Sequence, residues 1–191
     1  MATGEATTKT RARPLSIEDR RSAIIDAVIP MLLENGRDVT TRQIAERAGV
    51  AEGTLFRAFG DKDSIIDAAV ERYFDPEPIR RMMAAIDPDA PLREKVNDLL
   101  TILQGRTEGV INLMGALGPG RMPPRRPDEG FVDMISGVLR DDAHSLHFSA
   151  EEIAYFLRLI AFASSIKPFN ETHPFTIDTL TDFVVIGISK D

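Results

Sequence analysis

The sequence predicts an all-α protein in two parts: an N-terminal three-helix domain and a larger helical domain after it. Two observations predict this class. Apolar residues recur at the spacing of a helix face in one stretch after another, beginning with Ile24, Ile25, Val28, Leu32 and Leu33. Between residues 40 and 59, two short helical stretches are joined by a turn containing Gly49, which is the layout of a DNA-reading helix-turn-helix.

The first helix is expected from Ser16 to about Glu34. Ser16 is a suitable N-cap, and Glu18 and Asp19 follow in the first turn, where the helix dipole favours acidic residues. Pro30 lies inside this helix, where it removes a backbone donor and tends to cause a kink.

The helix-turn-helix has its own local signals. Thr40 and Gln43 have the spacing of a capping box. Gly49 suits the end of the first helix, because glycine tolerates a positive φ. The second helix is expected over residues 52–59, with its apolar side chains facing inward, and a third helix over residues 61–74, capped by Asp61. The inward-facing residues of the second helix are predicted to be Leu55, Phe56 and Phe59.

The stretch IAERAGVAEGTLFRAFGDKDSII closely resembles the signature of TetR-family transcriptional regulators. The resemblance covers about residues 20 to 74, and three positions depart from it. Ala51 stands where the family often has Ser, Phe56 where it usually has Tyr, whose hydroxyl often contacts a phosphate, and Ala58 where it often has His or Tyr. The matching residues are Ile44, Ala45, Ala48, Gly49, Val50, Gly53, Leu55, Phe56, Phe59, Lys62 and Asp63.

A recognition helix reads base edges with its N-terminal and outward residues. Arg57 is the candidate for a guanine, Glu52 for a cytosine amine, and Thr54 for a phosphate or a thymine methyl group. Taken singly, each is also an ordinary surface residue. The DNA-binding set predicted from the pattern is Thr40, Thr41, Arg42, Ala51, Glu52, Gly53, Thr54, Arg57, Ala58, Phe59 and Lys62.

Composition restricts the class of protein. The 191 residues include no cysteine, which excludes disulfides and thiolate metal sites. No apolar stretch approaches the roughly 20 residues of a membrane span, and the N-terminus has no apolar signal core, so we expect a soluble, cytoplasmic protein. The net charge of −7 argues against nonspecific coating of nucleic acid. Residues 1–14 form a polar tail whose Lys9, Arg11 and Arg13 either contact DNA or stay solvated.

The second part, residues 76–191, is predicted to be helical throughout, with a domain boundary at about residue 75 that separates it from the helix-turn-helix domain of residues 15–75. Helices are expected at 79–86, 131–139, 149–166 and 176–188, and residues 92–117 form either one kinked helix or two, because Gly105 and Gly109 interrupt the pattern. Residues 117–130 are rich in Pro and Gly, and predict a loop that is a solvated linker, a lid or an additional DNA contact.

The helix over 153–166 is apolar on almost every side, and the last helix is apolar close to the chain end. A helix of this kind must be covered on all sides. These features predict a homodimer through the C-terminal helices, the alternative being that both helices only fill the core of one chain.

The family resemblance also implies a pocket for a small ligand, expected to be apolar, in the second part. Candidate lining residues are Met82, Met83, Leu103, Met114, Phe131, Met134, Phe156 and Phe162, although apolar residues at helical spacing are more often plain core. In the family, the helix equivalent to 61–74 joins the DNA-reading and regulatory parts.

We predict no catalytic residue, cofactor or metal, since the chain has no cysteine nucleophile, no Gly-rich phosphate loop and no G-x-S-x-G. Asp141, His144 and His147 have a spacing that shares one helix face, but they lie where a helix should be ending. The predicted function is a TetR-like regulator, with repression as the family's usual mode, that binds a palindromic operator as a homodimer and is released by a small ligand. The alternatives are a helical-bundle enzyme or metal-binding protein with an unused helix-turn-helix, and a DNA-binding dimer without a ligand.

Overall fold

A computed structural model describes residues 16–118, 130–166 and 174–190. Within these ranges the regular secondary structure is helical, apart from one isolated antiparallel bridge between Leu146 and Ser189, which confirms the predicted all-α class. None of the helices in these ranges is both long and apolar enough to cross a membrane. The elements are α1 (Ile17–Asn35), η1 (Gly36–Asp38), α2 (Thr41–Ala48), α3 (Glu52–Phe59), α4 (Lys62–Tyr73), α5 (Glu77–Ala84), α6 (Leu92–Leu117), α7 (Phe131–Val138), η2 (Ala143–Ser145), α8 (Ala150–Ser165) and α10 (Ile177–Ile188).

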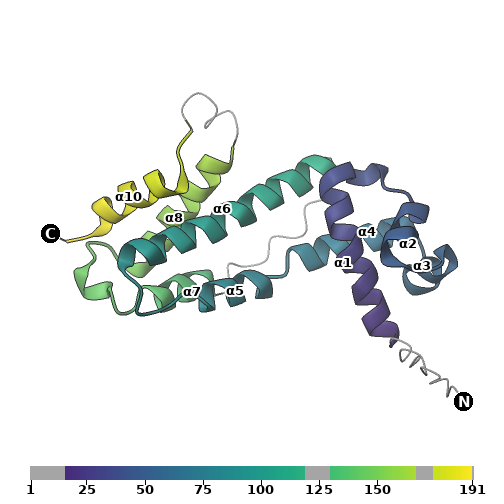
Figure 1. Ribbon diagram of the computed structural model, residues 1–191, viewed down its shortest axis with the longest axis horizontal. Helices are drawn as coiled ribbons and strands as arrows, with labels where there is room; N and C mark the ends of the chain where they lie inside the picture. Colours follow the sequence, from purple (N-terminus) through teal and green to yellow (C-terminus); the bar gives the residue numbers. More distant parts are fainter. Residues whose placement is uncertain (1–15, 119–129, 167–173, 191) are drawn as a thin grey trace, which may run out of the picture.

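The helices form an elongated molecule (Figure 1). Helices α2 and α3 lie at one end, α10 lies near the other, and α6 runs along much of the length between them. Helix α6 packs against α1, α5, α8 and α10. It therefore connects the end that carries the helix-turn-helix with the end that carries α10.

The predicted helix starts are confirmed by their caps. Ser16 accepts a hydrogen bond from the backbone of Asp19 at 3.0 Å. Capping boxes are present at Thr40 with Gln43 and at Ser149 with Glu152. These caps satisfy backbone donors that have no partner inside the helix, and they set where α1, α2 and α8 begin.

Two helices are more continuous than the sequence suggests. Helix α1 continues through Pro30 to Asn35. Helix α6 is a single 26-residue helix that passes through Gly105 and Gly109, which decides between the one-helix and two-helix alternatives. Packing on several sides of α6 compensates for the weak helix propensity of glycine, which costs about 1 kcal/mol per residue in an isolated helix.

Two hydrophobic cores lie along the molecule. The first contains apolar side chains of α1 to α4, and the second contains those of α5, α6, α7, α8 and α10. Leu113 and Leu117, from the C-terminal end of α6, belong to the first core, whereas Val96, Leu99 and Leu103 belong to the second. A domain boundary near residue 75 therefore remains a prediction, and the first core draws two side chains from beyond it.

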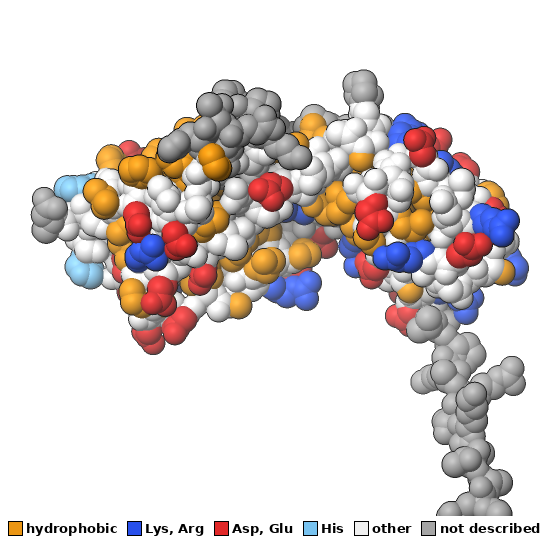
Figure 2. All heavy atoms as spheres, turned by 45° about the horizontal axis from the view of Figure 1, so that its top comes forward, with side chains coloured by type: hydrophobic (Ala, Val, Ile, Leu, Met, Phe, Trp, Pro, Cys, Tyr) orange, Lys and Arg blue, Asp and Glu red, His pale blue; other side chains and the backbone are white. Residues whose placement is uncertain are grey.

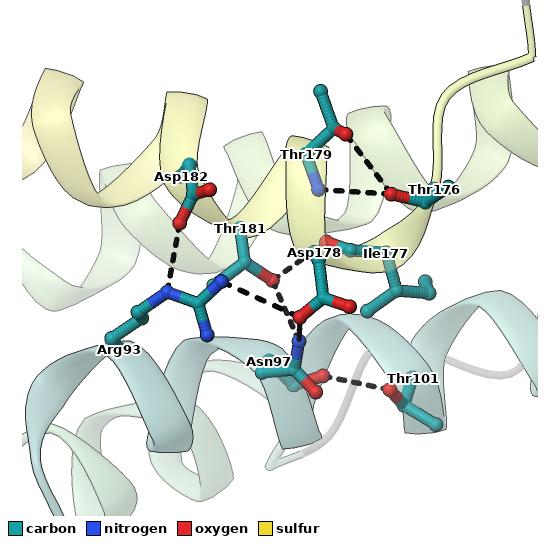
Figure 3. A network of polar contacts seen from close by, with 9 residues as sticks. All are labelled: Arg93, Asn97, Thr101, Thr176, Ile177, Asp178, Thr179, Thr181 and Asp182. Atoms are coloured by element: carbon teal, nitrogen blue, oxygen red, sulfur yellow. Dashed lines mark hydrogen bonds and ion pairs between the residues drawn. The ribbon is translucent and has the colours of Figure 1, made fainter.

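A polar network holds α10 on the N-terminal part of α6 (Figure 3). Arg93 donates to Asp182 at 2.8 Å, and Asn97 donates to Thr181 and to Asp178 at 3.2 and 3.3 Å. The Thr181 side chain is fully buried, and its hydroxyl donates to the carbonyl of Ile177. The network turns one side of α10 toward α6, so that the opposite side faces outward.

A buried ion pair joins the first turn of α6 to the connection between α7 and α8. The ammonium of Lys95 lies 2.9 Å from a carboxylate oxygen of Asp142. Lys95 is only 2% exposed. A charge at this depth requires its partner, because removing one member leaves the other uncompensated in a poorly solvated site.

Candidate nucleic-acid interface

The turn between α2 and α3 has the geometry that the sequence predicts. Gly49 adopts a left-handed conformation with φ 67° and ψ 31°, and the next amide, that of Val50, donates to the carbonyl of Ala45 at 3.0 Å. Ile44 in α2 and Leu55 in α3 are fully buried and belong to the first core. The turn and these anchors fix the orientation of α3 relative to α2.

The C-terminal end of α3 is secured by a residue of α1. The guanidinium of Arg21 donates to the carbonyl of Ala58, and it lies 4.2 Å from the centre of the Phe59 ring. Phe59 is only 8% exposed. The ring therefore faces inward, as predicted, and lies in the core beneath Arg21. Its predicted DNA contact stays a prediction.

The exposed side of α3 differs from the expected one. Glu52, Gly53, Phe56 and Arg57 are exposed, whereas Thr54 and Ala58 are only partly exposed. The prediction that Phe56 faces inward is wrong, since 46% of the residue is exposed. The reason is geometric: successive helix residues are about 100° apart, so a core that holds Leu55 and the residue four positions later leaves Phe56 at its edge.

Arg57 lies at one edge of this exposed face, beside Gly53. Its Nε donates to the carbonyl of Gly53 at 3.2 Å, so that the guanidinium folds back along α3 toward its N-terminal end. A Cβ placed on Gly53 would lie 3.9 Å from one terminal nitrogen of Arg57. No hydrogen bond of those terminal nitrogens occurs within the described part of the chain. They form the planar donor fork that suits a guanine edge.

The residues predicted to hold phosphates surround this face, and each has a partner within the chain. The Thr41 hydroxyl donates to the carboxylate of Glu52. The Nε of Arg42 lies 3.1 Å from Glu46, and Lys62 donates to the carbonyl of Arg37 at 2.7 Å. Thr40 is engaged in the capping box of α2, and Ala51, the N-cap of α3, provides no side-chain cap. Their roles toward DNA remain predictions.

Residues 24–69 match the family model for bacterial regulatory proteins of the tetR family. This range spans the buried part of α1, the helix-turn-helix and most of α4. The chain carries a TetR-family DNA-binding domain. The match confirms the resemblance seen in the sequence.

Similar curated proteins are regulators, and the similarity is confined to part of the chain. YvkB of Bacillus subtilis, called an HTH-type transcriptional regulator, is 39% identical over 51 residues, which is 26% of this chain and 27% of YvkB. The transcriptional repressor KstR of Rhodococcus jostii is 39% identical over 59 residues, 30% of this chain and 28% of KstR. The chain thus matches about a quarter of the length of these two relatives.

Solved structures share the fold over nearly the whole chain. The TetR regulator SCO0520 of Streptomyces coelicolor has a TM-score of 0.59 at 19% identity, covering 88% of this chain and 98% of that one. FadR of Bacillus subtilis, solved with stearoyl-CoA, has a TM-score of 0.52 at 19% identity, covering 86% and 95%. The superantigen PfiT has a TM-score of 0.58 at 18% identity, covering 93% and 100%. At such identities the likeness establishes the TetR-like fold of both parts, and function must be argued from the site.

The C-terminal end of α4, in the TetR-family domain, meets α6 at a close contact. A Cβ placed on Gly109 would lie 1.8 Å from the Tyr73 hydroxyl oxygen. The guanidinium of Arg106 donates to the carbonyl of Tyr73 and lies 4.9 and 5.7 Å from the ring centres of Tyr73 and Phe74. Burial raises the pKa of Tyr73 and lowers that of Arg106. Arg106 thus caps α4 from outside the helix, and α4 is tied to the helix that spans both cores.

A second contact ties the other end of α4 to α6 through η1. The Arg37 side chain lies 2.8 Å from Asp63, and the Arg37 carbonyl accepts from Lys62, the first residue of α4. Gly36 lies against the end of α6, where a Cβ would approach the carbonyl oxygen of Ala116 to 2.6 Å. A displacement of α6 would therefore act on α4 at both of its ends.

The predicted pocket residues are dispersed rather than gathered in one cavity. Met83 and Met134 line a cavity of about 300 Å³ between α5 and α7, together with Ala84, Ile86, Pro88, Gly137 and Val138, and with Arg80 and Asp133 as its polar members. Phe156 lines a different hollow of about 460 Å³ on α8 and α10, with Phe148, Phe183 and Gly187. Leu103 and Phe131 are core residues, and Met82, Met114 and Phe162 are exposed.

The remaining predicted features are the Asp141, His144 and His147 group, the basic tail and the Pro- and Gly-rich loop. Asp141, His144 and His147 do not converge, and no group of three or more side chains that could hold a metal ion occurs among the described residues. The basic tail (1–14), and residues 119–129 of the predicted loop lie outside the described residues, so their predicted roles stay predictions.

Proposed function

We propose that this chain is a transcriptional repressor that binds a palindromic operator as a homodimer and is released by a small apolar ligand. The observation that carries the proposal is the exposed face of α3 within a TetR-family domain, where the terminal nitrogens of Arg57 have no hydrogen-bond partner among the described residues. KstR, one of the similar proteins, is called a transcriptional repressor, and this supports repression rather than activation. No specific observation favours the alternative of a helical-bundle enzyme or metal-binding protein.

The outer face of α8 and α10 supports the homodimer. Six large apolar side chains of these helices are between 42% and 78% exposed, and Figure 2 shows hydrophobic side chains gathered on this part of the molecule. They are Tyr155, Phe156, Leu159, Phe162, Phe183 and Ile186. A continuous apolar face of this kind marks an interaction surface. A second copy of the same face would bury it, and a two-fold dimer would present two α3 helices to a palindromic site.

The cavity between α5 and α7 supports the ligand. Its lining is mostly apolar, with one cation, Arg80, and one anion, Asp133. The larger hollow on α8 and α10 lies on the face that we assign to the partner, so we assign the ligand to the α5–α7 cavity. The stearoyl-CoA bound to FadR, which has a long apolar acyl chain, supports a ligand with an apolar part within this fold. Movement of α6 and α4 would then couple ligand affinity reciprocally to DNA affinity.

The DNA-binding proposal is tested by selecting bound sequences from a random duplex pool at fixed salt. The wild-type protein should recover a palindrome, and Arg57→Ala should lose one strongly preferred base in each half-site, since one bidentate contact contributes about 1–3 kcal/mol of discrimination. Arg140→Ala is the control, because it removes an exposed cation outside the TetR-family domain and should leave the preference unchanged. Recovery of no motif, or binding that depends on salt alone, would contradict the proposal.

Sedimentation velocity tests the dimer. Leu159→Glu places a charge on the apolar face and should yield monomers, whereas Met82→Glu, at an exposed methionine of α5, should remain dimeric. A dimer that survives Leu159→Glu would remove α8 from the interface.

For the ligand, small apolar compounds that stabilise the wild-type protein against heat should fail to stabilise Gly137→Leu, whose side chain would enter the α5–α7 cavity. Stabilisation of both proteins would place the ligand elsewhere.

A further inference from the structure

Phe56 is an exposed aromatic residue on the recognition helix. Within residues 16–74, the exposed large hydrophobic side chains are Ile17 and Phe56, and Phe56 alone lies on the helix-turn-helix. It is absent from the first core and from the partly buried side chains packed around it, although its neighbours Leu55 and Phe59 are both core residues. The packing of this domain therefore does not explain why position 56 is a phenylalanine.

The neighbours of Phe56 on the surface are the residues proposed to read DNA. The exposed side of α3 consists of Glu52, Gly53, Phe56 and Arg57. Arg57 lies at one edge of this side with the guanidinium folded toward Gly53, and Phe56 lies about 100° around the helix from Arg57. An aromatic ring is thus presented beside the donor fork, on the same face.

The chemistry of the ring narrows what it can contact. Phenylalanine has neither a donor nor an acceptor, so it cannot hold a phosphate oxygen by a hydrogen bond. In the major groove, the apolar group that distinguishes one base pair from the others is the C5-methyl group of thymine. We propose that Phe56 is a specificity-determining residue that contacts a thymine methyl group next to the base pair read by Arg57. This inference rests on the proposed DNA-binding function.

The test removes the methyl group rather than the base pair. Each thymine of the selected half-site is replaced in turn by uracil, which pairs identically and lacks only the methyl. One replacement should weaken wild-type binding about fourfold, the effect expected for one buried methyl group. In Phe56→Ala, thymine and uracil at that position should bind equally.

Two further variants make the result specific. Lys62→Gln, at a predicted phosphate contact, should weaken binding to the thymine and uracil duplexes by the same factor. Phe56→Ser also removes the ring, at a position that is exposed, and should bind the thymine and uracil duplexes equally, which keeps the test decisive if Phe56→Ala unfolds in a circular dichroism melt.

Three outcomes would overturn the inference while leaving the proposed function intact. These are a palindrome without thymine in its half-sites, a palindrome insensitive to uracil at every position, and a uracil effect that persists in Phe56→Ala. If Phe56→Ala loses affinity although the wild-type protein binds the thymine and uracil duplexes equally, the ring packs on deoxyribose instead of on a methyl group. If the wild-type protein selects no palindrome, the proposed function and this inference fail together.

Discussion

Replacing Gly109 by alanine tests the contact between α4 and α6. The new Cβ would lie 1.8 Å from the hydroxyl oxygen and 3.1 Å from the Cζ of Tyr73, so the ring must move. That ring is partly buried, and its backbone carbonyl is held by Arg106. Overpacking of this kind costs about 1–3 kcal/mol. The gain in helix propensity on replacing glycine by alanine offsets about 1 kcal/mol of it.

Gly105, one turn earlier in the same helix, provides a matched control. A Cβ placed there has no heavy atom within 4 Å, so Gly105→Ala should stabilise the protein by the propensity gain alone, about 1 kcal/mol at most. The difference between the two variants cancels that gain and isolates the clash. We expect Gly109→Ala to be less stable than Gly105→Ala by about 1–3 kcal/mol.

The assay is urea unfolding followed by circular dichroism, at one protein concentration because association shifts apparent stability. Tyr73→Phe in the Gly109→Ala background should recover part of the loss, since it removes the nearest atom of the clash. Equal stability of the Gly105 and Gly109 variants would refute the close packing of Tyr73 on α6.

Three further predictions concern other contacts. Gly36→Ala should be less stable than Gly49→Ala by about 1–3 kcal/mol in urea unfolding, because both glycines have a positive φ but only the Cβ at 36 would strike the backbone of α6; equal losses would contradict this. Asp142→Asn should lower the free energy of unfolding by about 3–5 kcal/mol, because it leaves Lys95 without its buried counter-charge. Replacing both residues by apolar ones should restore most of that stability, and a double variant as unstable as the single one would refute the pairing. The pKa of Asp61 lies below its ordinary value of 3.8, because its carboxylate accepts hydrogen bonds from Ser64 at the start of α4. The stabilisation by this cap is therefore present above pH 3.8 and is lost as the pH falls through the lowered pKa. The melting temperature of Asp61→Asn should approach that of the wild type in acid, and a difference that stays constant with pH would argue against a charged cap.

Local features of the fold were predictable from the sequence. Ser16, Thr40 with Gln43, and Ser149 with Glu152 begin their helices as expected, because a cap involves residues within four positions of one another. The turn at Gly49 was predictable for the same reason. These signals were sufficient for the all-α class, the helix-turn-helix and the family resemblance.

The sequence by itself determined where the helices begin and which of them form the helix-turn-helix. Only the tertiary structure decided which sides of those helices remain exposed. Phe56 was expected inside and lies at the surface, whereas Phe59 was expected both to face inward and to contact DNA, and it lies in the core beneath Arg21. Likewise, the side chain that binds the Tyr73 carbonyl at the C-terminal end of α4 is Arg106, 33 residues along the chain. Such contacts join residues that are far apart in the sequence. The helical spacing of apolar residues indicates which way a side chain points, but it does not indicate which distant residue packs against it.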